Sequence, residues 1–520
     1  MLKKTIGIFG LLTLFLATGS LAQQEKSLSL SLEDCLMKAM KNNLDIAVEI
    51  LNPELADISV SRAKERFFPS LSLNFGNRST EQASYSWIEA SDSVTSKRND
   101  YSATISQIIP TGGNLSLSLS NYKNDSNRVT NTINPVYSST LRFNFTQPLL
   151  RNFGFKVNRQ EIIIAQNNLD MSENQLKQVL QQTIYSVEEA YWNFVYSIEM
   201  LKVRNQSLKL AQDLLEKNRK SVEVGTMAPI EILSAQSAVA TREADILAAE
   251  AQVRNNEDIL KSVINIAAEG KGADLAEIIP TEKPVYEKKE VTLEESLLTA
   301  MENRPDLQVT RINLKNREIN FDFAKNQLLP DLSLQASYWS PGISGDRILF
   351  EDPTDRFLPT GRDEGSPTDA IKDAFGLTYP NWSVSLTLDI PLNSFVSRAA
   401  FAQAQVNLEQ SLLQLKNQER QIYLEIKNSV RAVQTDYKRV QAYKVARELA
   451  GKKLTAEEER FRVGLTTPYF VLQYQTELST AQSNELNAII AYNLSLARLN
   501  RATGMSLKEK NIRFTDIFER

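Results

Sequence analysis

The chain has 520 residues, of which 42% are hydrophobic and 23% charged, and its formal net charge is -4. Positive and negative residues are interspersed and form no basic stripe, which argues against a nucleic-acid partner. There is no histidine, so Ser-His-Asp and Cys-His catalysis, histidine metal sites and the usual general base near neutral pH are absent. We therefore predict that the protein is not an enzyme and has no catalytic, cofactor-binding or metal-binding residues.

The first 22 residues have the pattern of a secretory signal peptide. Basic residues at the start precede an apolar run from Ile6 to Ala17, and small residues lead to a cleavage site after Ala22. A membrane anchor is the alternative, but the run is shorter than the roughly 20 apolar residues that a spanning helix needs. We expect an exported protein.

Two short helices are predicted next, over residues 32–41 and 44–67. Pro53 should kink or split the second of them. The single cysteine, Cys35, cannot form an intramolecular disulfide, and we expect it to be a small buried apolar residue on the first helix.

Strands are predicted over about 70–147, where apolar and polar residues alternate. The apolar positions include Leu71, Leu73, Phe75, Leu115, Leu117, Leu119, Leu141, Phe143 and Phe145. Such alternation is typical of a transmembrane β-barrel strand with a wet lumen, and equally of a half-buried soluble sheet. Export and the aromatic residues near strand ends, among them Tyr85, Trp87, Tyr101, Tyr122 and Tyr137, favour the membrane.

This region contains a tight-turn sequence, Pro110-Thr111-Gly112-Gly113, between the segments 100–109 and 114–122. It predicts an additional hairpin, so that four strands fit between Pro69 and Pro148. The alternative is one extended, bulged excursion above the barrel. The number of strands per chain is therefore four or six.

A long helix over 151–223 and a shorter helix over 229–266 complete the first repeat, residues 23–266. Apolar residues recur every three or four positions along the long helix, as in a coiled-coil core. Gly225 and Pro229 between the two helices predict a tight hairpin, because glycine permits the reversal and proline is tolerated in a helix's first turn.

The chain then repeats itself after a linker at 267–291. The segment 31–36 reappears at 292–297, and the segment 224–229 reappears at 463–468, without gaps within either frame. The second repeat, residues 292–505, is predicted to contain short helices over 293–302 and 306–328, strands over about 331–390, a long helix over 394–462 and a shorter helix over 468–503. Its strand region is predicted to hold two strands and a long acidic loop, 341–380. A tail follows at 506–520.

The duplicated order of short helices, strands, long helix, glycine break and shorter helix resembles the TolC family of outer-membrane efflux proteins. Asn303-Arg304-Pro305-Asp306-Leu307 is similar to a segment near the repeat start in that family. Gln147-Pro148-Leu149-Leu150 is similar to its passage from strands to long helix. The tip sequence 460–468 is the most specific match, and 222–229 is a weaker one.

The resemblance implies a mainly α fold with a β-barrel portion. Duplicated helical hairpins would form a trimeric α-barrel in the periplasm, and strands from three chains would close one transmembrane β-barrel, of twelve or eighteen strands, in outer-membrane lipid. It implies an exit duct in the outer membrane of a Gram-negative bacterium, for small molecules or proteins. The partners would be a periplasmic adaptor, or membrane fusion protein, and an inner-membrane transporter.

The resemblance also implies which residues act at the helical tips. The adaptor-contact residues would be Val224, Gly225, Thr226, Pro229, Arg462, Val463, Gly464, Leu465, Thr466 and Pro468. Glu231, Phe470 and Gln473 would form the gate. Family members often have aspartates where Phe470 and Gln473 stand, and an arginine in place of Thr466, so we predict an aromatic or amide constriction with lower cation affinity than an aspartate ring.

A second function, of another class, fits the same pattern. The chain could be a soluble periplasmic coiled-coil scaffold that binds a partner and conducts nothing.

Overall fold

The computed structural model describes residues 27–84, 89, 92–269, 273–284, 286–352 and 355–512. The predicted signal peptide, Tyr85 and Trp87 lie outside these ranges. The chain divides into two compact units. The tip unit comprises residues up to Leu44, Thr183–Glu290 and Ala432–Arg498, and the sheet unit comprises Asp45–Gln182, Val291–Arg431 and the residues from Leu499.

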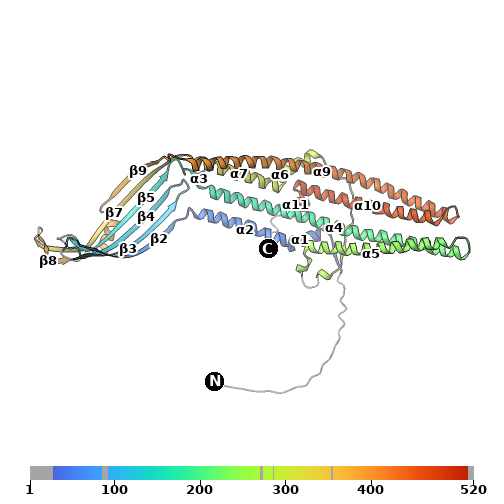
Figure 1. The fold of residues 1–520 in the computed structure, drawn as a ribbon, viewed down its shortest axis with the longest axis horizontal. Helices are drawn as coiled ribbons and strands as arrows, with labels where there is room; N and C mark the ends of the chain where they lie inside the picture. The colour runs from blue at the N-terminus through green and yellow to red at the C-terminus, as the bar shows by residue number, and fades with distance from the viewer. Residues whose placement is uncertain are drawn as a thin grey trace, which may run out of the picture. The chain divides into compact units, whose positions relative to one another are not determined.

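The helices occur in the duplicated order that the sequence predicts (Figure 1). They are α1 (Leu32–Asn42), α2 (Leu44–Glu65), α3 (Phe155–Asn158), α4 (Gln160–Glu223), α5 (Ile230–Ile264), α6 (Leu293–Asn303), α7 (Pro305–Asn326), α8 (Pro367–Phe375), α9 (Phe395–Arg462), α10 (Pro468–Thr503) and α11 (Ser506–Glu509). The repeated segments at 31–36 and 292–297 form matching helix starts. Ser31 Oγ accepts from the Asp34 amide, and Thr292 Oγ1 accepts from the Glu295 amide.

Two predictions about helices need correction. Pro53 does not split α2, which continues past it, and the proline is buried; a kink there stays a prediction. The first long helix does not begin at 151. Asn152 and Gly154 have positive φ angles of 61° and 100°, so the chain turns there before α3 and α4.

Seven strands form one antiparallel sheet in the sheet unit. They are β2 (Ser70–Ala83), β3 (Ser93–Ile108), β4 (Asn114–Ser126), β5 (Ile133–Pro148), β7 (Asp331–Asp352), β8 (Asp355–Asp363) and β9 (Asn381–Asp389). The order is β2-β3-β4-β5-β7-β8, and β9 pairs with the first part of β7, on the side away from β5. Adjacent strands lie beside one another in Figure 1.

The additional hairpin exists as β3 and β4. The two strands pair continuously from Ser96 opposite Ser126 to Ile108 opposite Asn114. Between them Gly112 has φ 96°, and a Cβ there would stand 2.3 Å from the Asn152 carbonyl oxygen, so glycine is required. The segment is thus a regular hairpin without a bulge, and its position relative to the membrane stays a prediction.

The predicted acidic loop at 341–380 is also wrong, because much of it has regular structure. β7 continues through Pro341 to Asp352, β8 follows, and α8 packs on β5 and β7. Ala370 and Ala374 of α8 are fully buried. Gly342 allows this close approach, since a Cβ there would lie 2.0 Å from the Ala370 carbonyl oxygen.

The predicted linker at 267–291 likewise contains structure. β6 (Ile278–Pro280) pairs in parallel with β1 (Leu28–Leu30) in the tip unit. Tyr191 of α4 is fully buried there, and its hydroxyl accepts a hydrogen bond from the Glu282 amide at 3.2 Å. Cys35 is buried as predicted. Of the tail, residues 506–512 are described and include α11.

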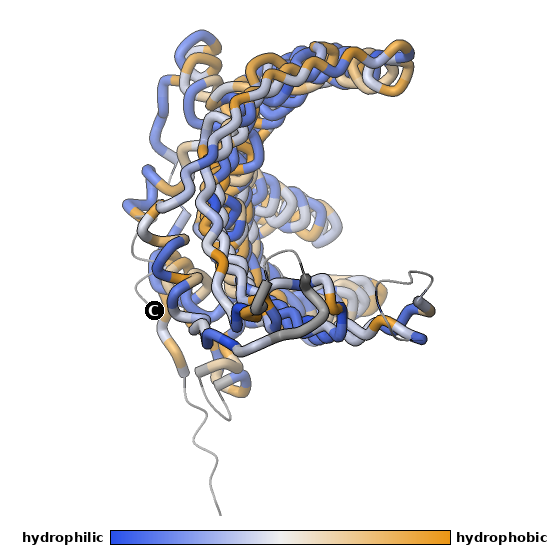
Figure 2. The backbone as a smooth tube through the Cα atoms, turned by 90° about the vertical axis from the view of Figure 1, so that its left-hand side faces the viewer, coloured by the Kyte–Doolittle hydropathy of each residue, from blue (hydrophilic) through white to orange (hydrophobic). Residues whose placement is uncertain are grey.

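Hydrophobic and hydrophilic positions follow one another closely along the traced chain (Figure 2). Within the described ranges, none of the helices has the combined length and apolarity that a membrane crossing demands.

Candidate functional site at the helical tips

The first tip joins α4 to α5 in the tip unit. Gly225 has φ 75°, and the Thr226 amide donates to the Ser221 carbonyl at 2.9 Å. This six-residue closure is the Schellman arrangement, which satisfies a carbonyl that the ending helix leaves free. Pro229 directly precedes α5 with a helical φ of -58°. Gly225 and Pro229, which predict the hairpin in the sequence, thus form its turn.

The second tip joins α9 to α10 with the same chemistry. Gly464 has φ 79°, and the Leu465 amide donates to the Arg460 carbonyl at 2.9 Å. Pro468 is the first residue of α10 and is buried. Neither tip glycine has an atom within 4 Å of where a Cβ would stand, so backbone conformation alone requires glycine.

Apolar side chains on both tips face outward. Val224, Val463 and Leu465 are 74%, 62% and 70% exposed. Thr226 and Arg462 are exposed as well, and Arg462 forms an ion pair with Glu459 at 2.5 Å. Exposed apolar side chains such as Val463 and Leu465, which share one turn, are typical of a protein-binding surface.

Thr466 has a different position from its neighbours, because its side chain turns inward. Its hydroxyl donates to Glu457 at 2.5 Å, and Glu457 also pairs with Arg460 at 3.0 Å. Glu457 is only 5% exposed. The hydroxyl thus helps to satisfy a buried carboxylate at the end of α9.

The three predicted gate residues lie on two helices, α5 and α10. Phe470 and Gln473 lie one turn apart on an exposed part of α10, and Phe470 contacts Tyr469 edge to face. Gln473 donates to Glu477 at 3.2 Å. Glu231 is half-buried on α5, at the position in the first repeat that corresponds to Phe470.

Arg242 on α5 is a buried charge in the tip unit that the sequence pattern does not reveal. It is 8% exposed and donates to the Ser207 carbonyl at 2.7 Å and to Gln475 Oε1 at 3.0 Å. Burial lowers the pKa of its guanidinium below the ordinary value. Nothing marks this arginine in advance, because it stands in a helical run among other polar residues and its partners are distant in the chain.

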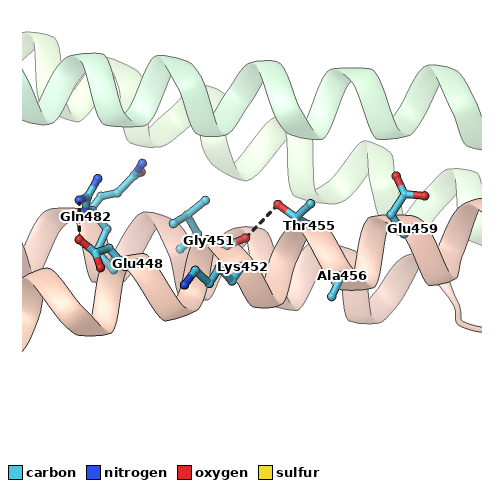
Figure 3. A pocket seen from close by; sticks show the side chains of 9 residues that line it. Glu448, Gly451, Lys452, Thr455, Ala456, Glu459 and Gln482 are labelled. Atoms are coloured by element: carbon cyan, nitrogen blue, oxygen red, sulfur yellow. Dashed lines mark hydrogen bonds and ion pairs between the residues drawn. The ribbon is translucent and has the colours of Figure 1, made fainter.

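An open groove also lies along α9 and α10 (Figure 3). Glu448, Lys452 and Glu459 of α9 and Gln482 of α10 line it. Thr455 turns back to the Gly451 carbonyl on its own helix, at 3.1 Å. The groove therefore presents charged and amide groups to solvent.

The sheet unit has its own candidate surface, since one face of the sheet carries a band of apolar side chains. Phe143 on β5 lies opposite Tyr338 on β7, and Tyr338 lies opposite Trp382 on β9. All three side chains are exposed. On the other face, Ser337 donates to Asn144 at 2.8 Å. The predicted alternation is therefore present, with both faces accessible in the isolated chain.

Duplicated helical hairpins closed by glycine tips, together with a sheet that is apolar on one face, are the construction of outer-membrane channel proteins. The family model for "Outer membrane efflux protein" matches residues 114–265 and 297–505. The chain belongs to this family. It is located in the outer membrane of a Gram-negative bacterium, with a periplasmic tunnel, and serves as an efflux channel; members of this family are not enzymes.

Individual relatives agree with this assignment. Outer membrane protein TolC of Vibrio cholerae is 22% identical over 355 residues, which cover 67% of this chain and 73% of TolC. The CmeC outer membrane channel of Campylobacter jejuni has a similar fold, with a TM-score of 0.62, 15% identity, and coverage of 93% of this chain and 90% of CmeC. The outer-membrane channel OprN has a TM-score of 0.64 at 15% identity, with coverage of 91% and 89%.

Proposed function

We propose that three copies of this chain form one exit duct. A transmembrane barrel would be built from their sheets and a periplasmic α-barrel from their helical hairpins. The observation that carries this proposal is a sheet with two open edges and one exposed apolar face. β2 is exposed along its whole length at one edge, and β9 is nearly so at the other.

The two edges are suited to each other. Each strand on the path from β2 through β7 to β9 runs antiparallel to its neighbour, so β2 and β9 have opposite directions. β9 of one copy can therefore pair antiparallel with β2 of the next, and a cyclic arrangement leaves no open edge. The apolar face then meets outer-membrane lipid and the polar face lines the lumen.

The tips are the proposed contact for a periplasmic adaptor, which in turn links the duct to an inner-membrane transporter. Val224, Val463 and Leu465 supply exposed apolar contact area, and Gly225 and Gly464 fix the turns that present it. Phe470 and Gln473, with Glu231, are the proposed constriction. Small molecules or proteins would pass without an energy-consuming step in this chain.

Membrane fractionation tests the duct against a soluble periplasmic scaffold. We expect the protein in the outer-membrane fraction, extracted only by detergent, with a cross-linked trimer on gels and conducting channels after reconstitution into planar bilayers. Recovery as a free periplasmic protein would refute the duct and support the scaffold. Glutamate at Val463 or Leu465 should weaken cross-linking to the adaptor, whereas glutamate at Thr455, away from the tips, should not.

A further inference from the structure

We propose that the β3–β4 hairpin spans the membrane with the other strands, so that each chain supplies six spanning strands and three chains close an eighteen-stranded ring. This inference rests on the proposed trimeric duct and adds the width of its outer opening. Barrel diameter grows roughly linearly with strand number, so the opening would be about 1.5 times as wide as in a twelve-stranded ring.

One row of side chains across the sheet carries the argument. Reading the strand registers from β2 to β9, directly opposed residues are Leu71, Ile105, Leu117, Phe143, Tyr338 and Trp382. All six are apolar or aromatic, and all are 39% to 74% exposed. The two hairpin strands supply Ile105 and Leu117, in the middle of this row. Their apolar face thus lies in the same band as the faces of the flanking strands.

The opposite face gives the complementary result. The adjacent row across the sheet, from β2 to β9, is Ser70, Ser106, Ser116, Asn144, Ser337 and Ser383. Hydrogen bonds link five strands of this row in two groups. Asn144 of β5 donates to Ser116 of β4 at 3.3 Å and accepts from Ser337 of β7 at 2.8 Å, and Ser70 of β2 and Ser106 of β3 share a bond of 2.9 Å. The hairpin has an apolar band on one face, Ala103 and Ile105 of β3 with Leu115, Leu117 and Leu119 of β4, against serine and threonine on the other face. A hairpin standing in water above the membrane would have no need of such a band.

The hairpin turn fixes the level at which β3 and β4 meet. Thr111 Oγ1 donates to Gln147 Oε1 at 2.8 Å, and the Gly154 amide donates to the Thr111 carbonyl at 3.0 Å. Gln147 lies at the end of β5, and Gly154 directly precedes α3. The turn is therefore tied to the end of the sheet where the helices begin, and the hairpin covers the same span as β5.

An insertion of two strands also preserves ring closure. With β3 and β4 present, β2 and β5 are both antiparallel to their neighbours, and without them β2 and β5 would still run in opposite directions. Adding a hairpin therefore widens the ring without changing how one copy meets the next. A wider outer opening suits bulky cargo that has already passed the tips.

Paired arginine substitutions test the position of the hairpin. Leu117→Arg places a charge on the apolar face of β4, and Ser118→Arg places it on the polar face one residue away. Phe143→Arg on β5, in the row of Leu117, reports on the sheet as a whole. We expect Leu117→Arg and Phe143→Arg each to reduce assembled trimer in the outer membrane at least tenfold, and Ser118→Arg to change it less than twofold.

The outcomes separate the two proposals. A loss with Phe143→Arg but not with Leu117→Arg would place the hairpin outside the membrane and overturn this inference, while the duct would stand. No loss with either would overturn the duct itself. Cysteine variants at 117 and 118 serve where arginine blocks folding. A lipid-soluble maleimide should label Leu117→Cys and a water-soluble one Ser118→Cys, whereas the reverse labelling would contradict the inference.

Width is tested by excising residues 93–126, which brings β2 beside β5 with Leu71 opposite Phe143. Neutral polymers of increasing size, added on the outer side of reconstituted channels, lower the conductance only when they enter the opening. The unaltered channel should admit polymers about 1.5 times as wide as those that the excised variant admits. Equal size limits in the two channels would contradict the eighteen-stranded ring.

Discussion

Arg242 and Gln475 form a 3.0 Å hydrogen bond that joins α5 to α10 beneath the tips. Gln475 in turn donates to the Leu210 carbonyl of α4 at 3.2 Å, so three helices meet at this pair. Both acceptors of Arg242, Gln475 Oε1 and the Ser207 carbonyl, are neutral, and the guanidinium is buried. Breaking a hydrogen bond between a buried charged group and a neutral acceptor costs more free energy than breaking one between two neutral groups.

Replacing Arg242 with methionine should therefore loosen the tip unit. We expect a loss of about 1.5–3 kcal/mol, the range for a hydrogen bond to a charged group, seen as faster amide hydrogen exchange in α5 and α10. Arg204→Met is the matched control, because Arg204 forms a partly exposed ion pair with Asp245 at 3.3 Å, worth about 0–1 kcal/mol. Equal exchange in the two variants would argue against a special role for Arg242.

Replacing Gly451 inside α9 and Gly464 in the turn after it should change stability in opposite directions. Gly464→Ala should destabilise the second tip by about 1 kcal/mol, because its φ of 79° is unfavourable for alanine although space is free. Gly451→Ala should stabilise α9 by about 0.5–1 kcal/mol, since Gly451 lies inside the helix and a Cβ would meet only Leu478 at 3.9 Å.

Thermal unfolding followed by circular dichroism measures both changes. Gly464→Asn should fall between wild type and Gly464→Ala, since asparagine tolerates the left-handed region better. A destabilised Gly451→Ala variant would mean that the methyl group displaces Leu478. An unchanged Gly464→Ala variant would mean that the tip can close with another backbone conformation.

The parts of the fold that follow from local chemistry can be predicted from the sequence. Helix starts at Ser31 and Thr292, and both tips, depend on residues within six positions of one another. The hairpin of β3 and β4 is equally local, because Gly112 and Gly113 mark its turn. Repetition of these signals in two halves makes each prediction stronger.

The parts that depend on distant partners could not be predicted. β6 is a strand only because β1, at the other end of the first repeat, pairs with it. α8 is capped locally, with Ser366 accepting from the Thr368 amide, but its charged and mixed sequence resembles a loop until it packs on β5 and β7. Arg242 is a site residue only through the positions of Ser207 and Gln475.

Asp306 in the sheet unit should make the free energy of unfolding depend on pH. Burial alone would raise its pKa, but two short hydrogen bonds from Arg304, at 2.7 and 2.9 Å, and the charge of Arg304 outweigh burial and hold the pKa below the ordinary 3.8. The carboxylate therefore stabilises the fold fully above about pH 4. That contribution should disappear as the pH falls below 3.8 through the lowered pKa.

Comparing wild type with Asp306→Asn by urea unfolding at several pH values tests this. The variant should be less stable by about 1–3 kcal/mol at pH 7, and the difference should shrink as the pH falls below about 4. Asp369→Asn is the control. Asp369 forms an exposed ion pair with Lys372 at 3.2 Å, and loss of that pair should lower the free energy of unfolding by about 0–1 kcal/mol. A difference that does not change with pH would show that packing, rather than charge, explains the effect.

The proposed constriction predicts how multivalent cations act on reconstituted channels. Phe470 and Gln473 are exposed on α10 and carry no charge, and Glu231 on α5 is the one acidic member of the set. Phe470 and Gln473 cannot chelate a trivalent cation, and Glu231 is half-buried, so we expect only weak block of the wild-type conductance. Gln473→Asp, which puts three carboxylates in the trimer, should lower the half-blocking concentration at least tenfold, and Gln473→Asn should leave it unchanged. A strong wild-type block that disappears in Glu231→Gln would instead assign the constriction to Glu231.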